Sequence, residues 1–317
     1  MEHMAKMVGL GSFLPEKVLS NFDLEKMVET TDEWITSRTG IKERRIASET
    51  ETPSVMGVHA AKLALKNAAI DPLKIDLILV ATMTPEYCGC PSTAALIQSG
   101  LNLLNIPAFD VQAACTGYLY ALSTAKAFVD SGQYRNVLVV ATEKMSSIVD
   151  FTDRATCVLF GDGASAFVVS SEGKGLQINT VNLGGDGSLS DLIKVSLNKQ
   201  KQHITLKGKE VFKHAVRRMA QSIDKSLLDL GLKNEDISWL VPHQANGRII
   251  DALGRHIGFP ESKVYTNIHK YGNTSASSVG IALDELLLEH PPSPGDRFLL
   301  VAFGAGLTWG SALLTQN

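Results

Sequence analysis

The sequence lacks the features that mark membrane proteins, secreted proteins and general nucleic-acid binders. Its longest apolar runs, such as 77–81 and 137–141, fall far short of the ~18 residues that a membrane span requires. Residues 1–11 contain no apolar signal core. With 30 basic and 33 acidic side chains, the net charge of −3 offers no basic excess for nucleic acid. We therefore expect a cytoplasmic protein that binds neither membrane nor nucleic acid.

Cysteines and aromatic residues are also few. The four cysteines, Cys88, Cys90, Cys115 and Cys157, form no C-x-x-C pair and have no histidine-rich companion segment. This pattern argues against a zinc site, and we expect no metal centre. Aromatic residues make up 6% of the chain, whereas glycine supplies 26 residues, so the composition favours close backbone approaches.

Helical segments alternate with short apolar strands along the chain. The segments 53–69 and 116–129 are predicted to be helices, and 75–81 and 136–142 are predicted to be strands. Because these strands show no polar alternation, both of their faces should be covered by helices. The pattern therefore indicates an α/β fold built in layers.

The second half of the chain repeats the strands of the first. The strand at 77–81 resembles 238–242, and the strand at 137–141 resembles 298–302. Both pairs are offset by 161 residues (242 − 81 and 302 − 141). Two equal offsets indicate a duplication, which we interpret as halves at 1–171 and 172–317.

The segments around these strands follow the same plan. The strand pairs bracket helices predicted at 116–129 and 275–288, and Gly-rich and Ala-rich strands at 161–169 and 304–314 close the two halves. The polar segment 188–208 interrupts the second half, and we expect it to form an excursion or flap.

Cys115 lies between a short strand and a helix. Residues 109–117 place small side chains before the thiol, and the predicted helix begins directly after it. A helix N-terminus carries unpaired N–H groups and partial positive charge, which stabilise a thiolate and lower the thiol pKa. The position therefore predicts a nucleophile, although a buried core cysteine is the commoner role for such a residue. Cys157, in the strand-like run 155–160, is expected to be a core residue.

His243 and Asn273 occupy matched positions in the second half. His243 follows the strand at 238–242, at the carboxyl end where α/β ligand sites lie, and Asn273 precedes the helix at 275–288. Each residue alone fits a structural role, and an Asn before a helix is commonly an N-cap. The duplication brings both to the axis between the halves, beside Cys115. A thiolate, a neutral imidazole and an amide at one point suit acyl transfer.

Five motifs carry a resemblance to a known family. They are AACTG at 113–117, FGDGA at 160–164, PHQAN at 242–246, GNTSA at 272–276 and FGAGLTWGS at 303–311. In this order the chain resembles β-ketoacyl-acyl carrier protein synthase III, the initiating condensing enzyme of bacterial fatty acid synthesis. The resemblance implies the duplicated thiolase-like fold, layered α-β-α-β-α, with two pseudo-symmetric halves.

The resemblance also implies a two-step acyltransferase reaction. Cys115 takes an acyl group from acyl-CoA, and His243 and Asn273 then hold the thioester oxygen of malonyl-acyl carrier protein while CO2 leaves. The resulting carbanion attacks the acyl-enzyme and gives 3-oxoacyl-acyl carrier protein. The backbone N–H groups of Cys115 and Ala305 would form the oxyanion hole, where the Gly304-Ala305-Gly306 turn permits close approach. No cofactor is implied, because acyl-CoA is a substrate.

The substrate contacts and the assembly follow from the same resemblance. The residues that match CoA contacts are Thr30, Trp34, Arg38, Arg154, Phe212 and Asn246. Trp34 and Arg154 match the pair that encloses the adenine, since indole and guanidinium both stack on a base. Lys213, Arg248 and Arg255 match the basic patch that docks the acidic carrier protein. The family is homodimeric, and we expect a homodimer here.

The acyl pocket departs from the usual family pattern. Phe303 and Cys90 match pocket positions, but Cys90 stands before Pro91 where many members have Phe, and Leu307 also replaces a frequent Phe. In the family the loop 85–91 closes the pocket of the partner subunit. A Cys at this point predicts that the enzyme accepts primers longer than acetyl, unless Tyr87 fills the space.

Three other functions stay open at this point. A specialised condensing enzyme of secondary metabolism can keep the same three residues and use another primer or a CoA-bound extender. A non-catalytic acyl-CoA-binding scaffold is disfavoured by the intact set, and a thiol hydrolase is disfavoured because the family places no activated water beside it. The sequence does not determine primer length or branching.

Overall fold

The computed structural model describes residues 4–198 and 201–317. Its strands are β1 (Lys6–Phe13), β2 (Val18–Ser20), β3 (Glu43–Arg45), β4 (Leu77–Ala81), β5 (Ala108–Val111), β6 (Asn136–Glu143), β7 (Gly163–Ser170), β8 (Leu176–Gly185), β9 (Ile193–Asn198), β10 (Lys201–Leu206), β11 (Trp239–Pro242), β12 (Arg297–Gly304) and β13 (Thr308–Gln316). Its α-helices are α1 (Asn21–Leu24), α2 (Asp32–Thr39), α3 (Pro53–Ala68), α4 (Thr93–Gly100), α5 (Gly117–Asp130), α6 (Gly208–Leu230), α7 (Gly247–Ile257), α8 (Ile268–Tyr271) and α9 (Ser278–Glu289).

The helix predicted at 53–69 and the strands predicted at 75–81 and 136–142 form where the apolar pattern placed them. The strand predicted at 304–314 does not: β12 ends at Gly304, and after a turn β13 begins at Thr308. Every residue of β4 and β6 is buried, because helices cover both faces of these strands. The helix predicted at 53–69 is α3, which begins after Thr52 and ends before Ala69. The Thr52 side chain accepts the N–H of Val55, and Pro53 occupies the first helical position, where its missing N–H costs nothing.

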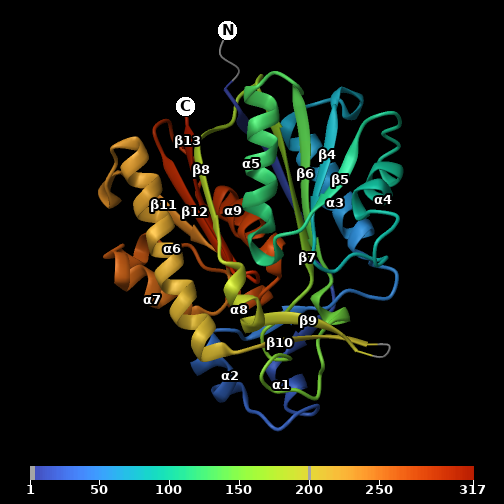
Figure 1. The fold of residues 1–317 in the computed structure, drawn as a ribbon, viewed down its shortest axis with the longest axis vertical. Helices are drawn as coiled ribbons and strands as arrows, with labels where there is room; N and C mark the ends of the chain where they lie inside the picture. The colour runs from blue at the N-terminus through green and yellow to red at the C-terminus, as the bar shows by residue number, and fades with distance from the viewer. Residues whose placement is uncertain (1–3, 199–200) are drawn as a thin grey trace.

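The two halves of the chain form sheets of matching topology (Figure 1). The strand order is β1-β7-β6-β4-β5 in the first half and β8-β13-β12-β11 in the second. In both, the closing strand, β7 or β13, is antiparallel to its neighbours, while β4 with β6 and β11 with β12 are parallel. A short pairing of β1 with β8 joins the two sheets.

The helices complete a five-layer arrangement around these sheets. α3 packs on β1, β6 and β7, and α6 packs on β8, β12 and β13, so these helices cover the outer faces. α5 and α9 each contact strands of both sheets and therefore lie between them, as Figure 1 shows for α5. The fold is the expected duplicated α-β-α-β-α arrangement.

The segment 188–208 forms a hairpin, and a nearby prediction is wrong. β9 and β10 pair as an antiparallel hairpin, and the Ile204 N–H donates to the carbonyl of Ile148, which ties β10 to the body. The run 155–160 was predicted to resemble a strand but forms turns. Asp153 causes this, because its carboxylate accepts the Ala155 N–H and the Thr156 hydroxyl. Cys157 is buried there, as expected.

Neither membrane spans nor metal clusters occur in the part of the chain that the structure describes. No helix within 4–198 or 201–317 is long and apolar enough to cross a bilayer. Within the same ranges no three His, Cys, Asp or Glu side chains lie together as ligands for a metal ion.

Candidate active site

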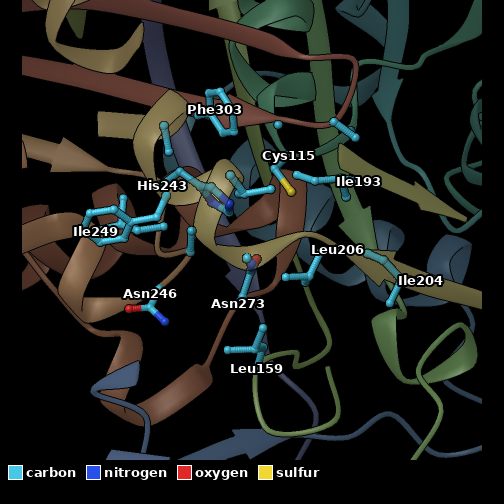
Figure 2. Close-up of a pocket in the computed structure, with 18 of the residues that line it drawn as sticks. Cys115, Leu159, Ile193, Ile204, Leu206, His243, Asn246, Ile249, Asn273 and Phe303 are labelled. Atoms are coloured by element: carbon cyan, nitrogen blue, oxygen red, sulfur yellow. The ribbon is translucent and has the colours of Figure 1, made fainter. Parts of the chain in front are cut away.

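A largely apolar cavity of about 150 Å³ lies between the two halves (Figure 2). Cys115, His243 and Asn273 all line it, together with Phe303 and Ala305. The hairpin covers part of the cavity with Ile193, Ile204 and Leu206, and Leu159 also lines it. The structure therefore brings together three polar side chains that are far apart in the sequence, inside an aliphatic enclosure.

Cys115 belongs to a one-turn 3-10 helix, Ala114–Thr116, that leads directly into α5. Ala114, the residue before it, has a φ of 47°, a left-handed conformation that is uncommon for a residue with a side chain. The Cys115 side chain is partly accessible through the cavity, and its Sγ lies 3.4 Å from the Ser275 hydroxyl oxygen. The turn thus presents the thiol at the base of the cavity.

The expected low thiol pKa is not found. Burial raises the pKa of Cys115 to about 12, and the nearby Glu143 carboxylate adds to this rise, while hydrogen bonds from Ser275 and from its own backbone N–H oppose it. Although solvent reaches the residue through the cavity, the sulfur itself is surrounded by protein. Desolvation of the anion therefore outweighs the helix terminus, and the resting group is a thiol. The prediction of a resting thiolate was wrong.

His243 follows β11, and its backbone N–H donates to the carbonyl of Val301. The side chain is buried, and burial lowers its imidazole pKa to about 3, so the ring is neutral, as expected. Nδ1 lies 2.5 Å from the Ser278 hydroxyl, which also accepts the N–H of Gln244. The Ser278 oxygen already accepts one hydrogen bond, and its own proton can be donated to Nδ1. A ring nitrogen that accepts this proton carries none itself, so the ring proton lies on Nε2.

Asn273 is held on both sides by backbone hydrogen bonds. Its N–H donates to Leu159, its carbonyl accepts from Gly161, and it forms a bridge with Phe160. The side-chain Oδ1 accepts the N–H of Ser275 at 2.8 Å. This bond fixes the amide plane with Oδ1 engaged, so the Nδ2 group is the free end that can donate into the cavity.

The Gly304 turn passes very close to the nucleophile. A Cβ at Gly304 would lie 2.9 Å from the backbone nitrogen of Cys115 and 3.0 Å from that of Thr116. Ala305 follows and lines the cavity, and its carbonyl accepts the Thr308 hydroxyl. Glycine is therefore required where the two halves meet at the Cys115 N–H, the position where an oxyanion hole was expected.

The expected CoA residues lie in two groups. Arg38 and Arg154 both stack on the Trp34 ring, with guanidinium carbons 4.5 and 4.8 Å from its centroid, and Arg154 also donates to the carbonyl of Glu29. In this arrangement Arg154 covers the ring directly, so an adenine between them requires the arginine to move. The Thr30 hydroxyl oxygen is buried beside this group, without a hydrogen-bond partner among the described residues.

The other expected substrate contacts surround the cavity. Phe212 of α6 and Asn246, the N-cap of α7, line it. The neighbouring Lys213 and Arg248 are exposed, as is Arg255, and the helices that carry them pack against each other. Three cations thus lie on the exposed surfaces of the two helices whose first turns line the cavity.

The two acyl-pocket positions differ in their surroundings. Phe303 is buried and lines the cavity, and Leu307 is buried in the same apolar cluster. Cys90 is exposed in the loop between β4 and α4, outside the residues that line the cavity of its own chain. Its expected contact with a partner subunit stays a prediction.

Sequence reasoning missed three polar residues of the site, Glu143, Ser275 and Ser278. Glu143 is completely buried at the end of β6, and Ser275 lies between it and Cys115. The signal that singled out His243, a polar residue at the carboxyl end of an apolar strand, applies equally to Glu143. Ser275 lies within the GNTSA motif, two residues after Asn273, so that motif was the available signal for it.

Comparisons with known proteins agree on one family. Family models described as 3-oxoacyl-[acyl-carrier-protein] synthase III and its C-terminal part match residues 109–187 and 227–316. A β-ketoacyl-[acyl-carrier-protein] synthase III of Chlamydia pneumoniae is 54% identical, over 96% of this chain and 95% of the relative.

Solved structures give the same result. A 3-oxoacyl-[acyl-carrier-protein] synthase III from Aquifex aeolicus superposes with a TM-score of 0.94 at 49% identity, over 98% of this chain and 99% of that one. A priming β-ketosynthase of a polyketide biosynthetic pathway superposes with a TM-score of 0.93 at 38% identity, over 99% and 97% of the two chains. This chain therefore belongs to the β-ketoacyl-acyl carrier protein synthase III family, the acyltransferases of thiolase-like fold that carry out the initiating condensation of fatty acid synthesis.

Proposed function

We propose that this chain condenses an acyl-CoA primer with malonyl-acyl carrier protein to give 3-oxoacyl-acyl carrier protein, CoA and CO2. The observation that carries this proposal is the meeting of Cys115, His243 and Asn273 in one apolar cavity. Cys115 serves the first half-reaction, and His243 and Asn273 together serve the second.

Cys115 is the nucleophile in the first half-reaction. Its sulfur attacks the thioester carbonyl of acyl-CoA, and the negative charge that develops on oxygen is stabilised by the backbone N–H groups of Cys115 and Ala305. The close approach of Gly304 to the Cys115 nitrogen supports this placement. Because the thiol pKa is raised to about 12, the sulfur must lose its proton as it attacks.

His243 and Asn273 serve the second half-reaction. When malonyl loses CO2, electrons move toward its thioester oxygen, and two neutral donors stabilise that oxygen better than a charged acid would. The lowered pKa of His243 keeps its ring neutral, and the bond from the Ser275 N–H to Asn273 orients its amide. The apolar lining favours conversion of a carboxylate into neutral CO2.

The surfaces around the cavity bind CoA and acyl carrier protein, the two molecules that carry the acyl groups. Trp34, Arg38, Arg154 and Thr30 bind the nucleotide end of CoA, while Phe212 and Asn246 contact its pantetheine arm. Lys213, Arg248 and Arg255 dock the acyl carrier protein by local electrostatic attraction, since the net charge of the chain is −3. The protein acts as a homodimer in which the loop of Cys90 closes the partner's acyl pocket, and it needs no cofactor or metal.

The test separates the two half-reactions. Incubation with radiolabelled acyl-CoA should place one label on Cys115, and addition of malonyl-acyl carrier protein should release it as 3-oxoacyl-acyl carrier protein. A Cys157→Ser variant is the matched control, because Cys157 is buried, does not line the cavity and should leave labelling normal. A chain that binds acyl-CoA without retaining label would be a scaffold, and the proposal would fall.

A second candidate is the priming step of a specialised pathway. The superposition with the polyketide priming β-ketosynthase favours it, because that enzyme shares the fold at 38% identity. A scan of acyl-CoA primers of increasing length against malonyl-acyl carrier protein and malonyl-CoA distinguishes the two. Preference for the carrier-bound extender supports fatty acid initiation, and preference for malonyl-CoA supports the specialised pathway.

A further inference from the structure

Glu143 is a buried carboxylate in contact with the nucleophile through one hydroxyl. It ends β6 and is completely buried. Its Oε1 lies 3.0 Å from the Ser275 hydroxyl oxygen, which in turn lies 3.4 Å from Cys115 Sγ. The hydroxyls of Thr82 and Thr84 and the N–H of Met83 also donate to this carboxylate. Such a set of bonds fixes Glu143 in the one orientation that faces Ser275.

The Ser275 hydroxyl can connect its two neighbours in two ways. It has one proton, so it can accept the Cys115 S–H while donating to ionised Glu143, or accept from protonated Glu143 while donating to a Cys115 thiolate. These two states differ by the transfer of a single proton along the chain of hydrogen bonds. Met83 Sδ, 3.3 Å from the same hydroxyl, is the other contact of Ser275 Oγ.

We propose that Glu143 takes up the thiol proton of Cys115 through Ser275 when the enzyme is acylated, and holds it until condensation releases the cysteine. This inference rests on the proposed function, because it assigns the proton movements of that reaction. Glu143 and Ser275 act on the substrate through Cys115 and are positioning residues.

The proton balance closes over both half-reactions. In acylation the S–H bond of Cys115 breaks, a bond from sulfur to the acyl carbon forms, and the carbon–sulfur bond to CoA breaks. Glu143 keeps the thiol proton, and the CoA thiolate takes one from water. In condensation the cysteine leaves as a thiolate and recovers the stored proton through Ser275. Glu143 is thus uncharged while a malonyl carboxylate enters and negative charge develops beside it.

The charges around Glu143 suit this role. Burial raises its pKa to about 7, although the hydrogen bonds from Thr84, Met83 and Ser275 oppose the rise. Among the groups that face it from the β4 end, η7 (Ser275–Ser277) and the Cys115 turn, Cys115 is the titratable one. Lys144, the next residue, directs its ammonium to the carbonyls of Ser48 and Glu51 instead. His243, with a pKa near 3, is the weaker base of the two buried groups.

Proton uptake during acylation tests the proposal directly. Wild-type enzyme is mixed with acyl-CoA at pH 8 in weak buffer with an indicator dye, without malonyl-acyl carrier protein. Because the pKa of Glu143 is about 7, a proton stored there is lost to water at pH 8 once the acyl-enzyme equilibrates, so storage predicts a transient uptake of up to one proton per acyl-enzyme in a stopped-flow record. Transfer of the thiol proton to CoA predicts no uptake at any time. Glu143→Gln should acylate about 10²–10⁴-fold more slowly and take up no proton. The acylation rate of the wild type should rise through pH 7 as Glu143 ionises, and the Glu143→Gln variant should lose that rise.

Matched variants separate this role from structural damage. Asp162→Asn alters another fully buried carboxylate, which is held by Ser146 and the Ala47 N–H, and should behave as wild type. Ser275→Ala should act like Glu143→Gln, whereas Ser277→Ala, which removes a buried hydroxyl bonded to the Thr274 carbonyl, should not. If Glu143→Gln does not fold, the serine pair answers the same question.

The outcomes keep this inference distinct from the proposed function. If wild-type enzyme forms no acyl-Cys115, the proposed function itself fails. If wild-type enzyme acylates without proton uptake, or Glu143→Gln or Ser275→Ala acylates at the wild-type rate and pH dependence, only the storage of the proton on Glu143 is overturned.

Discussion

The two halves of the molecule use the same backbone for different chemistry. β12 lies 161 residues after β6 at both ends (297 − 136 and 304 − 143), and α9 begins 161 residues after α5 (278 − 117). Ala114 and Ser275, also 161 apart (275 − 114), share a left-handed conformation, with φ values of 47° and 52°. The same strained turn therefore precedes both central helices.

At these matched positions the backbone is similar, but the side chains differ. Cys115 corresponds to Ala276, His243 to Thr82, and Asn273 to Gln112, each at the same offset of 161 residues. Glu143 corresponds to Gly304, where a Cβ would meet the Cys115 backbone. The first half thus supplies the nucleophile and a buried carboxylate, while the second supplies the neutral donors and the glycine. The comparison teaches that the duplication built the site, and that divergence at a few turn positions gave each half its role.

Removing the nucleophile should have the largest effect on this division of labour. Cys115→Ser should lower acyl-enzyme formation by on the order of 10⁴-fold or more, because a serine hydroxyl is much less nucleophilic and acidic than the thiol. Labelling with acyl-CoA measures the loss, and a melting temperature close to that of wild type shows that the fold survives. Full acyl transfer by this variant would remove Cys115 from its assigned role.

Substitution of Asn273 should slow only the second half-reaction, the condensation with malonyl-acyl carrier protein. Asn273→Ala should retain acylation but lose about 10²–10³-fold in malonyl decarboxylation, because one preorganised donor is gone. Gln112→Ala, the matched change in the first half, should leave decarboxylation unaffected.

A second substitution distinguishes hydrogen-bond donation by Asn273 from its support of the Ser275 turn. Asn273→Asp keeps an oxygen that can accept the Ser275 N–H but lacks the Nδ2 donor. If Asn273 acts as a donor, the Asn273→Asp variant should be as slow in decarboxylation as the Asn273→Ala variant. Recovery of both half-reactions by the aspartate variant would instead mean that Asn273 mainly holds the Ser275 turn.

The buried titratable groups of the two halves should give opposite pH dependence of stability. The folded-state pKa of Glu143 is raised to about 7 from 4.5, so its contribution is present below pH 4.5 and is lost as the pH rises to 7. The folded-state pKa of His243 is lowered to about 3 from 6.5, so its contribution is present above pH 6.5 and is lost as the pH falls.

Glu143→Gln isolates the contribution of Glu143 to the pH dependence of stability. The variant should gain stability relative to wild type between pH 4.5 and 7, by on the order of 3–4 kcal/mol, since each pKa unit is worth about 1.4 kcal/mol. Chemical denaturation of the variant and of wild type at several pH values measures the difference. A difference that does not change with pH would show that Glu143 titrates alike in the folded and unfolded chains.

Substitution of Cys90 should have the smallest effect, because it should change only the preference for primer length. If Cys90 closes the partner's acyl pocket, Cys90→Phe should shift the preference from hexanoyl- and octanoyl-CoA toward acetyl-CoA. Each buried methylene is worth ~0.8 kcal/mol, or about fourfold in specificity. An unchanged chain-length profile would mean that Tyr87 closes the pocket or that the loop lies elsewhere in the dimer. Cys88→Phe is a control two positions away.

Local pattern was enough for the strands and for the repeat between the two halves. The unbroken apolar runs of β4 and β6 could only be buried on both faces, and the equal offsets predicted the second sheet from the first. Motifs around Cys115, His243 and Asn273 then indicated the family. We propose the boundary between the halves at residues 171 and 172, in the turn between β7 and β8.

The protonation of the site was decided by tertiary structure. The sequence determined that Cys115 precedes a helix and that Glu143 ends a strand, but not that Ser275, 132 residues after Glu143, lies between them. The sequence predicted Trp34 and Arg154 on either side of an adenine and a flap at 188–208, but not that Arg154 lies directly on the Trp34 ring or that Ile204 lines the cavity. A pKa depends on how completely a group is removed from water and on which charges and donors surround it, and those neighbours come from distant parts of the chain. The sequence alone therefore determined which groups are present, and packing of the two halves decided which of them carries the proton.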